Sequence, residues 1–483
     1  MKKLTRRQVL QTSMAGGIAA LSGTTRAHSS IKAQSANADL PNILLILSDD
    51  HSVPHLGCYG DSGIRTPNLD RFAAEGLRFN RAYTSAPQCS PSRASIFTGL
   101  PPQRVCMSRL AAPLPPEHVT FMELLRDNQQ YYTGVCGRWH HMDGRIGPNP
   151  QLKKIYEQHN MQQFANRVDY CSYERDRMLH MRRFLDQVPS GQPFFLQMGF
   201  NDPHYKWDSD AIPEPHDPDK IKVPPYLPDI PSLRESLARH FDEIARMDKD
   251  FGDIIHELDE RELRNNTLVI FMGDNGLAFP RGKGTLYQPG VNVPMLARWP
   301  GVIEAGRVTD ELVGGVDMGA TFLDIAGVDI PNWWESRSFR NLLTGDTYNG
   351  RDFLFTASGW HNREGISALD SLDLCRSAVS RTHSFIYNCL PHQPHRAADW
   401  YREQFWVDMK SLHQKGQLAT EFGAAYFNST RPVFELFDLQ SDPHEFRNLA
   451  GDSTHRVVEA QMKAALDEWM HANYDFLPPP TMA

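Results

Sequence analysis

Residues 41–51 read PNILLILSDDH, an apolar run that ends abruptly in two aspartates and a histidine. A short apolar run of this kind, bounded by polar residues, is typical of a β-strand. We therefore predict a strand over residues 42–47, with polar side chains at its carboxyl end.

Three further runs have the same design: YYTGV at 131–135, FFLQMGF at 194–200 and LVIFM at 268–272. Between the last two, apolar residues recur at steps of three and four from Leu233 to Leu258, which predicts one long helix or a broken pair. Short apolar runs that alternate with helical patterns indicate an α/β layer fold.

Polar residues of the types used in catalysis and metal binding follow each of the four runs. Because ligands gather at the carboxyl ends of strands in open α/β sheets, we expect these side chains to line one basin. In chain order they are Asp49 and Asp50, then Arg138 and His140, then His204, then Asp274 and Asn275, with Lys283 shortly after. The alternatives for the histidines and cations are structural histidines and solvated surface charges.

Oxygen ligands dominate this set. Asp49, Asp50, Asp274 and Asn275 suit a hard cation such as Ca²⁺ or Mg²⁺ better than zinc. Taken alone, the two adjacent aspartates are typical of a helix N-cap, and GDNG at 273–276 is typical of a turn. Together, at the ends of two strongly apolar strands, they favour a metal site.

The composition excludes two classes of function. The chain has 483 residues, with 50 Lys and Arg against 58 Asp and Glu, hence a net charge of −8 and no basic block to bind nucleic acid. No apolar run approaches the roughly 20 residues that span a bilayer, so we expect no stable membrane insertion.

Residues 1–38 have the layout of an export signal and linker. Arg6 and Arg7 precede a short, weakly apolar segment, which resembles a twin-arginine signal, and cleavage is expected after Ala38 or after Ala27. The alternative is a frayed basic arm. We expect an exported protein, periplasmic or secreted. Its 7 cysteines are irregularly spaced, which permits disulfides without predicting them.

QCSPSRASIFTG at 88–99 places Cys89 at the expected start of a helix. A helix N-terminus lowers the pKa of a thiol and favours negative charge, so the residues predict a cysteine nucleophile, with a buried inert cysteine as the alternative.

The segment Cys89-x-Pro91-Ser92-Arg93, followed by Thr98-Gly99, resembles the signature of the type I, formylglycine-dependent sulfatases. Other stretches are similar to further motifs of that family, in the family's order. They are PNILLILSDD at 41–50, GRWH at 137–140, DPH at 202–204, GDNG at 273–276 with GKGTLYQPGVNVPMLARWPG at 282–301, and FELFDLQSDPHEFRNLA at 434–450.

The resemblance implies an alkaline-phosphatase-like mixed sheet flanked by helices, with a smaller C-terminal α+β subdomain. Its domains would be a catalytic domain at 39–345 and the subdomain at 346–483. Shorter strand-like runs after about residue 345, and a helical pattern near 455–473, accord with that division.

The resemblance also implies the roles of individual residues. Cys89 would be modified to formylglycine (3-oxoalanine) by a formylglycine-generating or sulfatase-maturating enzyme, and a hydroxyl of its hydrate would attack sulfur. A cation, Ca²⁺ or alternatively Mg²⁺, would be held by Asp49, Asp50, Asp274, Asn275 and the modified Cys89. Arg93 would support the hydrate, His204 with Lys283 would protonate the leaving atom, and His140 would remove the proton that releases sulfate. Arg138 departs from the family's usual lysine; it keeps the charge but does not readily donate a proton.

Within the family, MDKDFGDIIHELDERELRNNTLVIFMGDNGLAFPRGKGTLYQPG at 247–290 and CRSAVSRTHSFIYN at 375–388 most resemble heparan N-sulfatases, the N-sulfoglucosamine sulfohydrolases. We expect the specificity to lie on three loops: the proline-rich stretch 205–231, WHNR at 360–363 and PHQPHR at 391–396. Within the first of these, residues 213–231 carry seven prolines, which predicts an extended covering loop. The substrate-contact candidates are His361, Arg363, His392 and His395, each with a solvated-loop alternative.

Three hypotheses from different classes follow. The first is a sulfatase on a sulfated carbohydrate, either an N-sulfatase or an O-sulfatase that acts on another polysaccharide, for example an algal one. The second is a metal-dependent phosphohydrolase, since an aspartate-rich cation site also suits phosphate esters. The third is a non-catalytic glycan-binding relative in which Cys89 stays a thiol. The ordered motifs favour the first hypothesis.

Overall fold

The computed structural model describes residues 40–110, 112–144, 150–172, 176–361, 372–395 and 399–482. The first predicted strand is β1 (Asn42–Ser48), and all of its residues are buried. It lies between β6 (Phe194–Gly199) and β7 (Thr267–Gly273) and runs parallel to both. The fourth predicted strand, β4 (Tyr132–Cys136), pairs in parallel with β6. The four runs therefore form one parallel block at the centre of the sheet.

Four shorter strands complete this 8-stranded sheet, whose order is β5-β4-β6-β1-β7-β8-β2-β9. They are β2 (Leu77–Phe79), β5 (Tyr170–Ser172), β8 (Met295–Arg298) and β9 (Arg307–Thr309). Strand β8 is antiparallel to both of its neighbours, which makes the sheet mixed. Two short strands, β3 (Ala82–Tyr83) and β10 (Val313–Gly314), pair separately in parallel.

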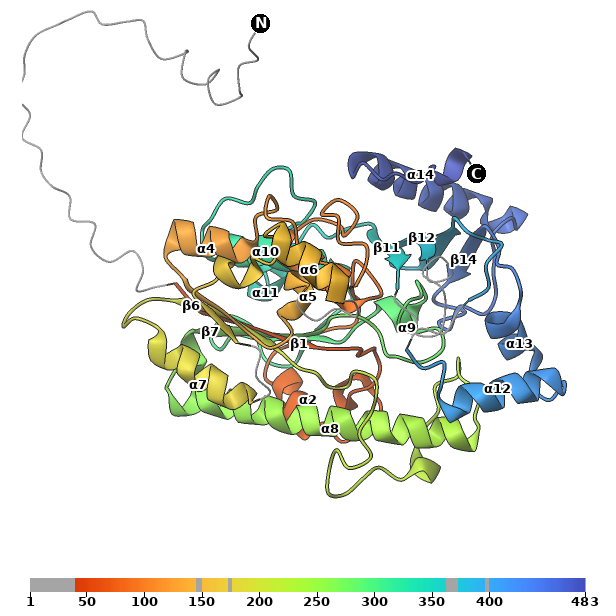
Figure 1. Cartoon of the computed structure of the whole chain (residues 1–483), viewed down its shortest axis with the longest axis horizontal. Coiled ribbons are helices and arrows are strands. Elements are labelled where there is room, and N and C mark those ends of the chain that lie inside the picture. Colours follow the sequence, from red (N-terminus) through yellow and green to blue (C-terminus); the bar gives the residue numbers. More distant parts are fainter. Residues whose placement is uncertain are drawn as a thin grey trace, which may run out of the picture. The chain divides into compact units, whose positions relative to one another are not determined.

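Helices cover both faces of this sheet, which explains why β1 is apolar throughout (Figure 1). Ile43, Leu45 and Leu47 of β1 pack in one core with α3 (Cys89–Thr98), α4 (Phe121–Gln129) and α10 (Met318–Ile325). Leu44 and Ile46 pack in the opposite core with α2 (Pro67–Ala74), α7 (Arg177–Gln187) and α8 (Pro231–Glu260).

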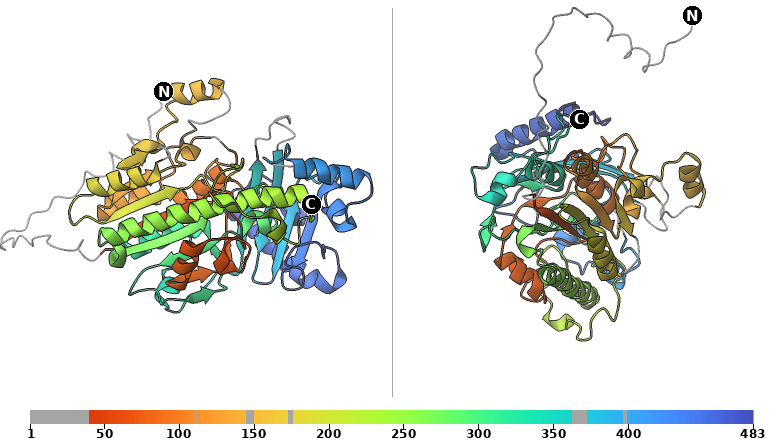
Figure 2. Two further views of the ribbon diagram at one scale, coloured as in Figure 1. Left: turned by 90° about the horizontal axis from the view of Figure 1, so that it is seen from below. Right: turned by 90° about the vertical axis from the view of Figure 1, so that its left-hand side faces the viewer.

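Helix α8 is the predicted long helix, and it is one unbroken helix of 30 residues. It runs the length of its face of the sheet (Figure 2). In the proline-rich stretch that precedes it, only Pro218–Lys220 form a short 3-10 helix, which agrees with the predicted extended loop. The short helices are α5 (His140–Asp143), α6 (Pro150–Gln158), α9 (Gln288–Val291) and α11 (Arg340–Thr344).

A second, 4-stranded antiparallel sheet follows in the chain, in the order β11-β12-β13-β14. Its strands are β11 (Leu354–Trp360), β12 (Leu372–Val379), β13 (His383–Asn388) and β14 (Phe434–Asp438). One face packs on α14 (Arg456–Ala472), and the other packs on Leu286, Tyr287 and Val291 from the segment after β7. Helices α12 (Gln404–Gln414) and α13 (Thr420–Phe427) lie between β13 and β14 in the chain. Strand β12 was missed by the sequence analysis, because LDLCRSAV mixes charged and apolar residues.

The described residues include all seven cysteines and contain no disulfide bond. In the described ranges, no helix is both long and apolar enough to span a membrane.

The buried ion pair between Arg376 of β12 and Asp475, just beyond α14, provides a stability test. Arg376 Nε and Nη2 lie 2.5 and 3.0 Å from the two carboxylate oxygens, and both side chains are almost fully buried. Asp475→Ala would leave a buried guanidinium without its counter-charge, so we expect the free energy of unfolding to fall by about 3–5 kcal/mol in denaturant titrations.

The matched control is Asp253→Ala, which removes the exposed pair between Lys249 and Asp253. It should cost at most about 1 kcal/mol. Equal losses in the two variants would contradict the assigned role of the buried pair.

Candidate active site

The carboxyl ends of β4, β6, β1 and β7 lie side by side, because these strands are parallel neighbours. Backbone hydrogen bonds join the loops that follow them: the Asp49 N–H donates to the Asp202 carbonyl at 3.2 Å, and the Asp274 N–H donates to the Ser48 carbonyl at 3.0 Å. Asp50 has a φ of 62°, a left-handed conformation that turns the chain sharply after β1 and that aspartate tolerates better than most residues.

Cys89 is the first residue of α3, as predicted, and its side chain is buried. Its Sγ lies 3.0 Å from Asp49 Oδ1 and 3.8 Å from Asp50 Oδ1. Burial, together with the charge of Asp49, raises the pKa of the Cys89 thiol well above its usual value. Desolvation and the carboxylates therefore oppose the lowering of this pKa that we expect from the helix N-terminus.

The four predicted oxygen ligands converge and are fully buried. Asn275 Nδ2 donates to Asp50 Oδ1 at 2.8 Å, and the Asp50 N–H donates to Asp274 Oδ1 at 3.3 Å. Burial raises the pKa of Asp50 and that of Asp274 to about 7. Within the described part of the chain, the buried Asn275 Oδ1 has no hydrogen-bond partner. Crowded carboxylates and an orphaned amide oxygen fit a hard divalent cation.

Ligand atoms of Asp49, Asp50, Cys89 and His204 all lie within 4.8 Å of one another. The sulfur and imidazole in this group are softer than the oxygen set. A cation bound at this point would therefore contact carboxylate oxygens and the side chain at position 89.

Two arginines offset the negative charge of the carboxylates. Arg93 Nε lies 2.8 Å from Asp274 Oδ2, and its Nη2 lies 3.3 Å from Asp49 Oδ2. Arg138 Nε lies 2.9 Å from the same oxygen of Asp49. Burial alone would raise the pKa of Asp49, but Arg138, His204 and Arg93 lower it well below its usual value. Asp49 is thus ionised, and both guanidinium groups are directed at the metal-ligand cluster.

Lys283 lies at the centre of a second group. Its Nζ is 2.9 Å from Asp50 Oδ2, 3.3 Å from His204 Nε2 and 2.7 Å from Asp399 Oδ2. Burial lowers the pKa of His204 to about 3, helped by Lys283. Burial also lowers the pKa of Lys283, but Asp399 and Asp50 raise it further, well above its usual value. The pair therefore holds a proton on the lysine, with a neutral imidazole beside it.

His140 begins α5, and its ring stacks on that of His141 with centroids 4.3 Å apart. Burial, with Arg138 nearby, lowers the pKa of His140 to about 3, so its imidazole is neutral and able to accept a proton. His141 was not among the predicted site residues, yet its Nδ1 lies 3.0 Å from Ser90 Oγ and its Nε2 lies 3.9 Å from Asp49 Oδ2. Its only sequence signal was adjacency to His140.

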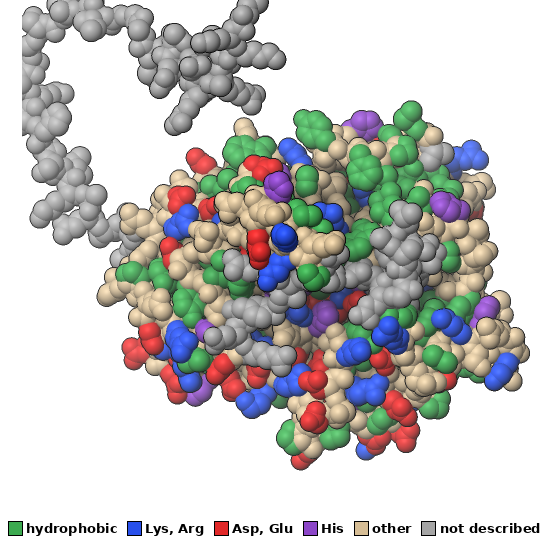
Figure 3. Space-filling model, viewed as in Figure 1, with side chains coloured by type: hydrophobic (Ala, Val, Ile, Leu, Met, Phe, Trp, Pro, Cys, Tyr) green, Lys and Arg blue, Asp and Glu red, His purple; other side chains and the backbone are tan. Residues whose placement is uncertain are grey.

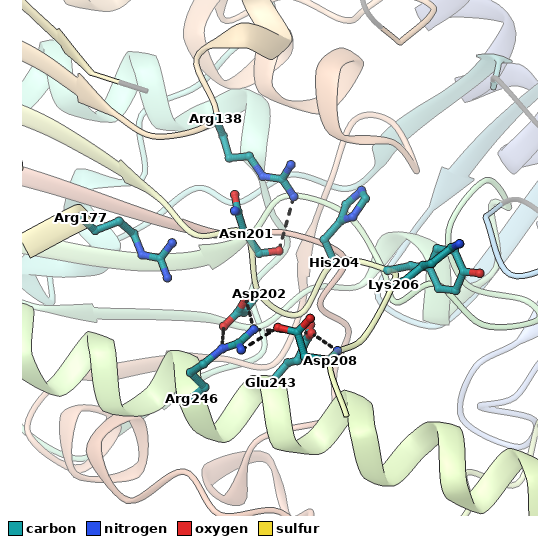
Figure 4. A pocket seen from close by; sticks show the side chains of 10 residues that line it. Arg138, Arg177, Asn201, Asp202, His204, Lys206, Asp208, Glu243 and Arg246 are labelled. Atoms are coloured by element: carbon teal, nitrogen blue, oxygen red, sulfur yellow. Dashed lines mark hydrogen bonds and ion pairs between the residues drawn. The ribbon is translucent and has the colours of Figure 1, made fainter. Parts of the chain in front are cut away.

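A pocket of about 400 Å³ adjoins this cluster, and Arg138 and His204 form part of its wall (Figure 4). Arg246 of α8 pairs with Asp202 at 2.7 and 3.0 Å and with Asp208 at 2.8 Å, which braces the opposite wall. Lys, Arg and His side chains gather near the centre of the face drawn in Figure 3. The polar lining suits a hydrophilic ligand such as a saccharide.

The residues predicted to contact the substrate from the loops do not all lie at the active site. His361 is buried, and its Nε2 lies 4.0 Å from Asp399 Oδ1, next to the Lys283 group. His395 lies farther along the C-terminal sheet, where its Nε2 is 2.9 Å from the Tyr287 hydroxyl. His392 is exposed. Arg363 lies outside the described residues.

Asp399 is a second site residue, besides His141, that the sequence analysis missed. It lies three residues beyond PHQPHR at 391–396, which was singled out for its histidines. A single aspartate in a loop gives no pattern, and only the fold brings it to Lys283.

The chain is similar to known proteins over most of its length. Residues 41–328 match the family model described as Sulfatase. N-sulphoglucosamine sulphohydrolase from Homo sapiens is 28% identical over 470 residues, which cover 90% of each chain. An ulvan-active sulfatase from Formosa agariphila is 25% identical over 506 residues, covering 92% of this chain and 78% of the relative.

Among solved structures, a protein in complex with its substrate D-glucosamine-2-N,6-O-disulfate superposes with a TM-score of 0.66 at 17% identity, covering 91% of this chain and 99% of that one. The predicted α/β fold, an alkaline-phosphatase-like mixed sheet flanked by helices, is confirmed.

The cation site generates a test that needs no catalysis. We expect Ca²⁺ at 100 times its dissociation constant to raise the free energy of unfolding by about 2.7 kcal/mol, because the oxygen ligands come together only in the folded chain. Thermal unfolding with Ca²⁺ and with EDTA measures the shift. Asp274→Asn should lose most of it, and the exposed control Asp253→Asn should keep it. An equal shift in the two variants would place the ion elsewhere.

Proposed function

Because the chain belongs to the sulfatase family and is a sulfuric ester hydrolase, we propose that it removes the N-linked sulfate of a glucosamine residue from a heparan-type saccharide. The observation that carries the catalytic part is the position of Cys89. It stands in the C-x-P-S-R segment at the start of α3, with Sγ 3.0 Å from Asp49 Oδ1 and next to the basic group of Lys283 and His204.

Asp49, Asp50, Asp274 and Asn275 would hold the cation, for which we propose Ca²⁺ with Mg²⁺ as the alternative. The formylglycine hydrate at Cys89 supplies the nucleophilic hydroxyl, and the cation supplies positive charge beside the sulfate oxygens. Every other contribution comes from the side chains around them.

Three cations stabilise negative charge. Arg93 bridges Asp274 and Asp49, and so orients two of the ligand carboxylates. Arg138 reaches Asp49 from the end of β4 and donates to the carbonyls of Phe200 and Asn201 at 3.3 and 3.4 Å. Lys283 lies within reach of a sulfate oxygen, and its charge matters more in this dehydrated site than it would in water.

Proton movements have matched donors and acceptors. Lys283 carries a proton and hydrogen-bonds His204 Nε2, so the pair can deliver one proton to the atom that leaves sulfur. His140, neutral at working pH, can accept the hydroxyl proton whose removal releases sulfate. The two histidines come from different strand ends, His140 after β4 and His204 after β6.

The N-sulfate assignment draws on the relatives. One relative is named an N-sulphoglucosamine sulphohydrolase, and one structural neighbour was solved with a glucosamine that carries N- and O-sulfate. The second candidate is an O-sulfatase on another polysaccharide, favoured by the ulvan-active relative at similar identity. The pocket beside Arg138 and His204 would take the sugar in either case. His361, Arg363, His392 and His395 stay candidates for sugar contacts.

Export and maturation complete the proposal. Residues 1–38, with the Arg6-Arg7 pair, would direct export to the periplasm or beyond, and a formylglycine-generating or sulfatase-maturating enzyme would convert Cys89. Residues 39–345 would form the catalytic domain and 346–483 the C-terminal subdomain.

Replacing the nucleophile position is the direct test. Cys89→Ala should lower sulfate release from N-sulfoglucosamine by about 10³-fold or more, measured by ion chromatography, because no hydrate can form. Cys106→Ala, which alters an exposed cysteine, should keep the wild-type rate. Full activity of Cys89→Ala, or an unmodified Cys89 in active protein by peptide mass spectrometry, would overturn the proposal. A non-catalytic glycan-binding relative would bind the sugar without releasing sulfate.

Arg138 allows a graded test. Arg138→Ala should lower kcat/KM by about 10²–10³-fold, as the loss of a charge-stabilising donor does elsewhere. Arg138→Lys restores the charge without the planar fork that reaches the two carbonyls, so we expect it to lose only about tenfold. Equal losses in the two variants would show that the fork, and not the charge, is what the site requires.

A further inference from the structure

Asp399 is a carboxylate at the active site with no role in the proposed reaction. It lies before α12, in the segment that follows the second sheet's strand β13. Its Oδ2 is 2.7 Å from Lys283 Nζ. The Lys283 side chain is 1% exposed, whereas that of Asp399 is 21% exposed, so Asp399 keeps surface that a ligand can touch.

The second oxygen of Asp399 is directed toward His361. Asp399 Oδ1 lies 4.0 Å from His361 Nε2, which is beyond hydrogen-bonding distance. The Asp399 carboxylate thus lies between the fully buried His361 and Lys283. Lys283 contacts both Asp399 and, through Asp50, the metal-ligand cluster.

The leaving atom of the substrate has to come close to this carboxylate. Under the proposed function, Lys283 and His204 protonate that atom, so it must lie within hydrogen-bonding distance of one of them. Asp399 contacts the same ammonium group. The inference that follows rests on the proposed function and concerns which leaving atom the site accepts.

We propose that Asp399 selects N-sulfate over O-sulfate by accepting a hydrogen bond from the N–H of the sulfamate. An N-sulfate, R–NH–SO₃⁻, carries one hydrogen on its leaving nitrogen. An O-sulfate, R–O–SO₃⁻, presents only lone pairs at the corresponding oxygen. An ionised carboxylate accepts hydrogen bonds and donates none, so it attracts the first and repels the second.

The proton count of the reaction is consistent with this role. The lone pair of the leaving nitrogen takes one proton from the Lys283–His204 pair, and the S–N bond breaks with its electron pair going to nitrogen, where it becomes the lone pair of the free amine. The original hydrogen stays on nitrogen throughout, so the product leaves as R–NH₂. Asp399 orients the nitrogen so that its lone pair is directed at the acid; it neither gains nor loses a proton.

The charges around Asp399 keep it in the form that this role needs. Burial would raise its pKa, but Lys283, His361 and His204 together lower the pKa below its usual value. The Asp399 carboxylate is therefore ionised except in strongly acidic solution. A site that carries a buried acceptor discriminates strongly against a substrate without the matching donor, because the acceptor is then left unpaired.

The alternative is that Asp399 only holds Lys283 in place. That role would make Asp399 equally important for every substrate, since both kinds of sulfate need the lysine. The two roles therefore differ in the ratio of activities on N- and O-sulfate, and not in the total activity.

The test compares N-sulfoglucosamine with glucosamine 6-O-sulfate on protein that carries formylglycine at Cys89. We expect Asp399→Asn to lower kcat/KM for the N-sulfate by about 100-fold and for the O-sulfate by less than about threefold. The matched control Asp408→Asn changes a carboxylate on α12 that bonds Ser232 and Gln404. It should leave both values unchanged.

A change in the substrate tests the same contact without relying on the variant's folding. The N-methylated sulfamate lacks the N–H, so wild-type protein should cleave it about 100-fold more slowly than the parent sugar. In Asp399→Asn, methylation should slow cleavage only a few-fold. In Asp399→Glu, which keeps the carboxylate, methylation should slow cleavage more than it does in Asp399→Asn.

Each outcome decides between the roles. Equal losses on the two sulfates in Asp399→Asn, a wild-type preference for the O-sulfate, or an equal methyl penalty in wild type and Asp399→Asn would overturn the inference while the sulfatase reaction stands. Release of sulfate from neither sugar by wild-type protein would overturn the N-sulfatase proposal, and this assignment with it.

Discussion

Three carboxylates, those of Asp49, Asp50 and Asp274, are buried together without exposure to solvent, and the rest of the site is arranged around their charge. Isolated buried carboxylates would be strongly disfavoured, so they need compensation by cations or by a metal. Arg93 and Arg138 supply it on one side and Lys283 on the other. A sulfate group would contact the same positive charges. The fold and the bound substrate would therefore both depend on the positive charge of these three residues.

The sheet makes this concentration of charge possible. Four parallel strands end at one edge, and each contributes a loop to the cluster. Both faces of the sheet are covered by apolar cores, which leaves the strand ends as the place where polar side chains can gather. Cys89 comes from a different element, the start of the fully buried helix α3, so its position depends on the packing of that helix against β1 and its neighbours.

The C-terminal sheet contributes to the same chemistry from a distance in sequence. Its inner face packs on Leu286, Tyr287 and Val291, which follow Lys283 in the chain. This contact brings His361 and Asp399 to the lysine. Lys283 thereby has partners from both parts of the fold: Asp50, which follows β1, and Asp399, which follows β13.

Local pattern alone determined the layout of the catalytic half. The four apolar runs predicted four strands, and the helical spacing from Leu233 to Leu258 predicted α8, because buried strands leave continuous apolar runs and half-buried helices leave a periodic apolar pattern. The polar residues after each run predicted a cation site. The C-x-P-S-R segment carried the family resemblance, and the family match agrees with it. What the pattern could not supply was the pKa of Cys89, the strand β12 and the place of Asp399. Those depend on desolvation and on contacts between distant segments, which only the packing of the two sheets decides.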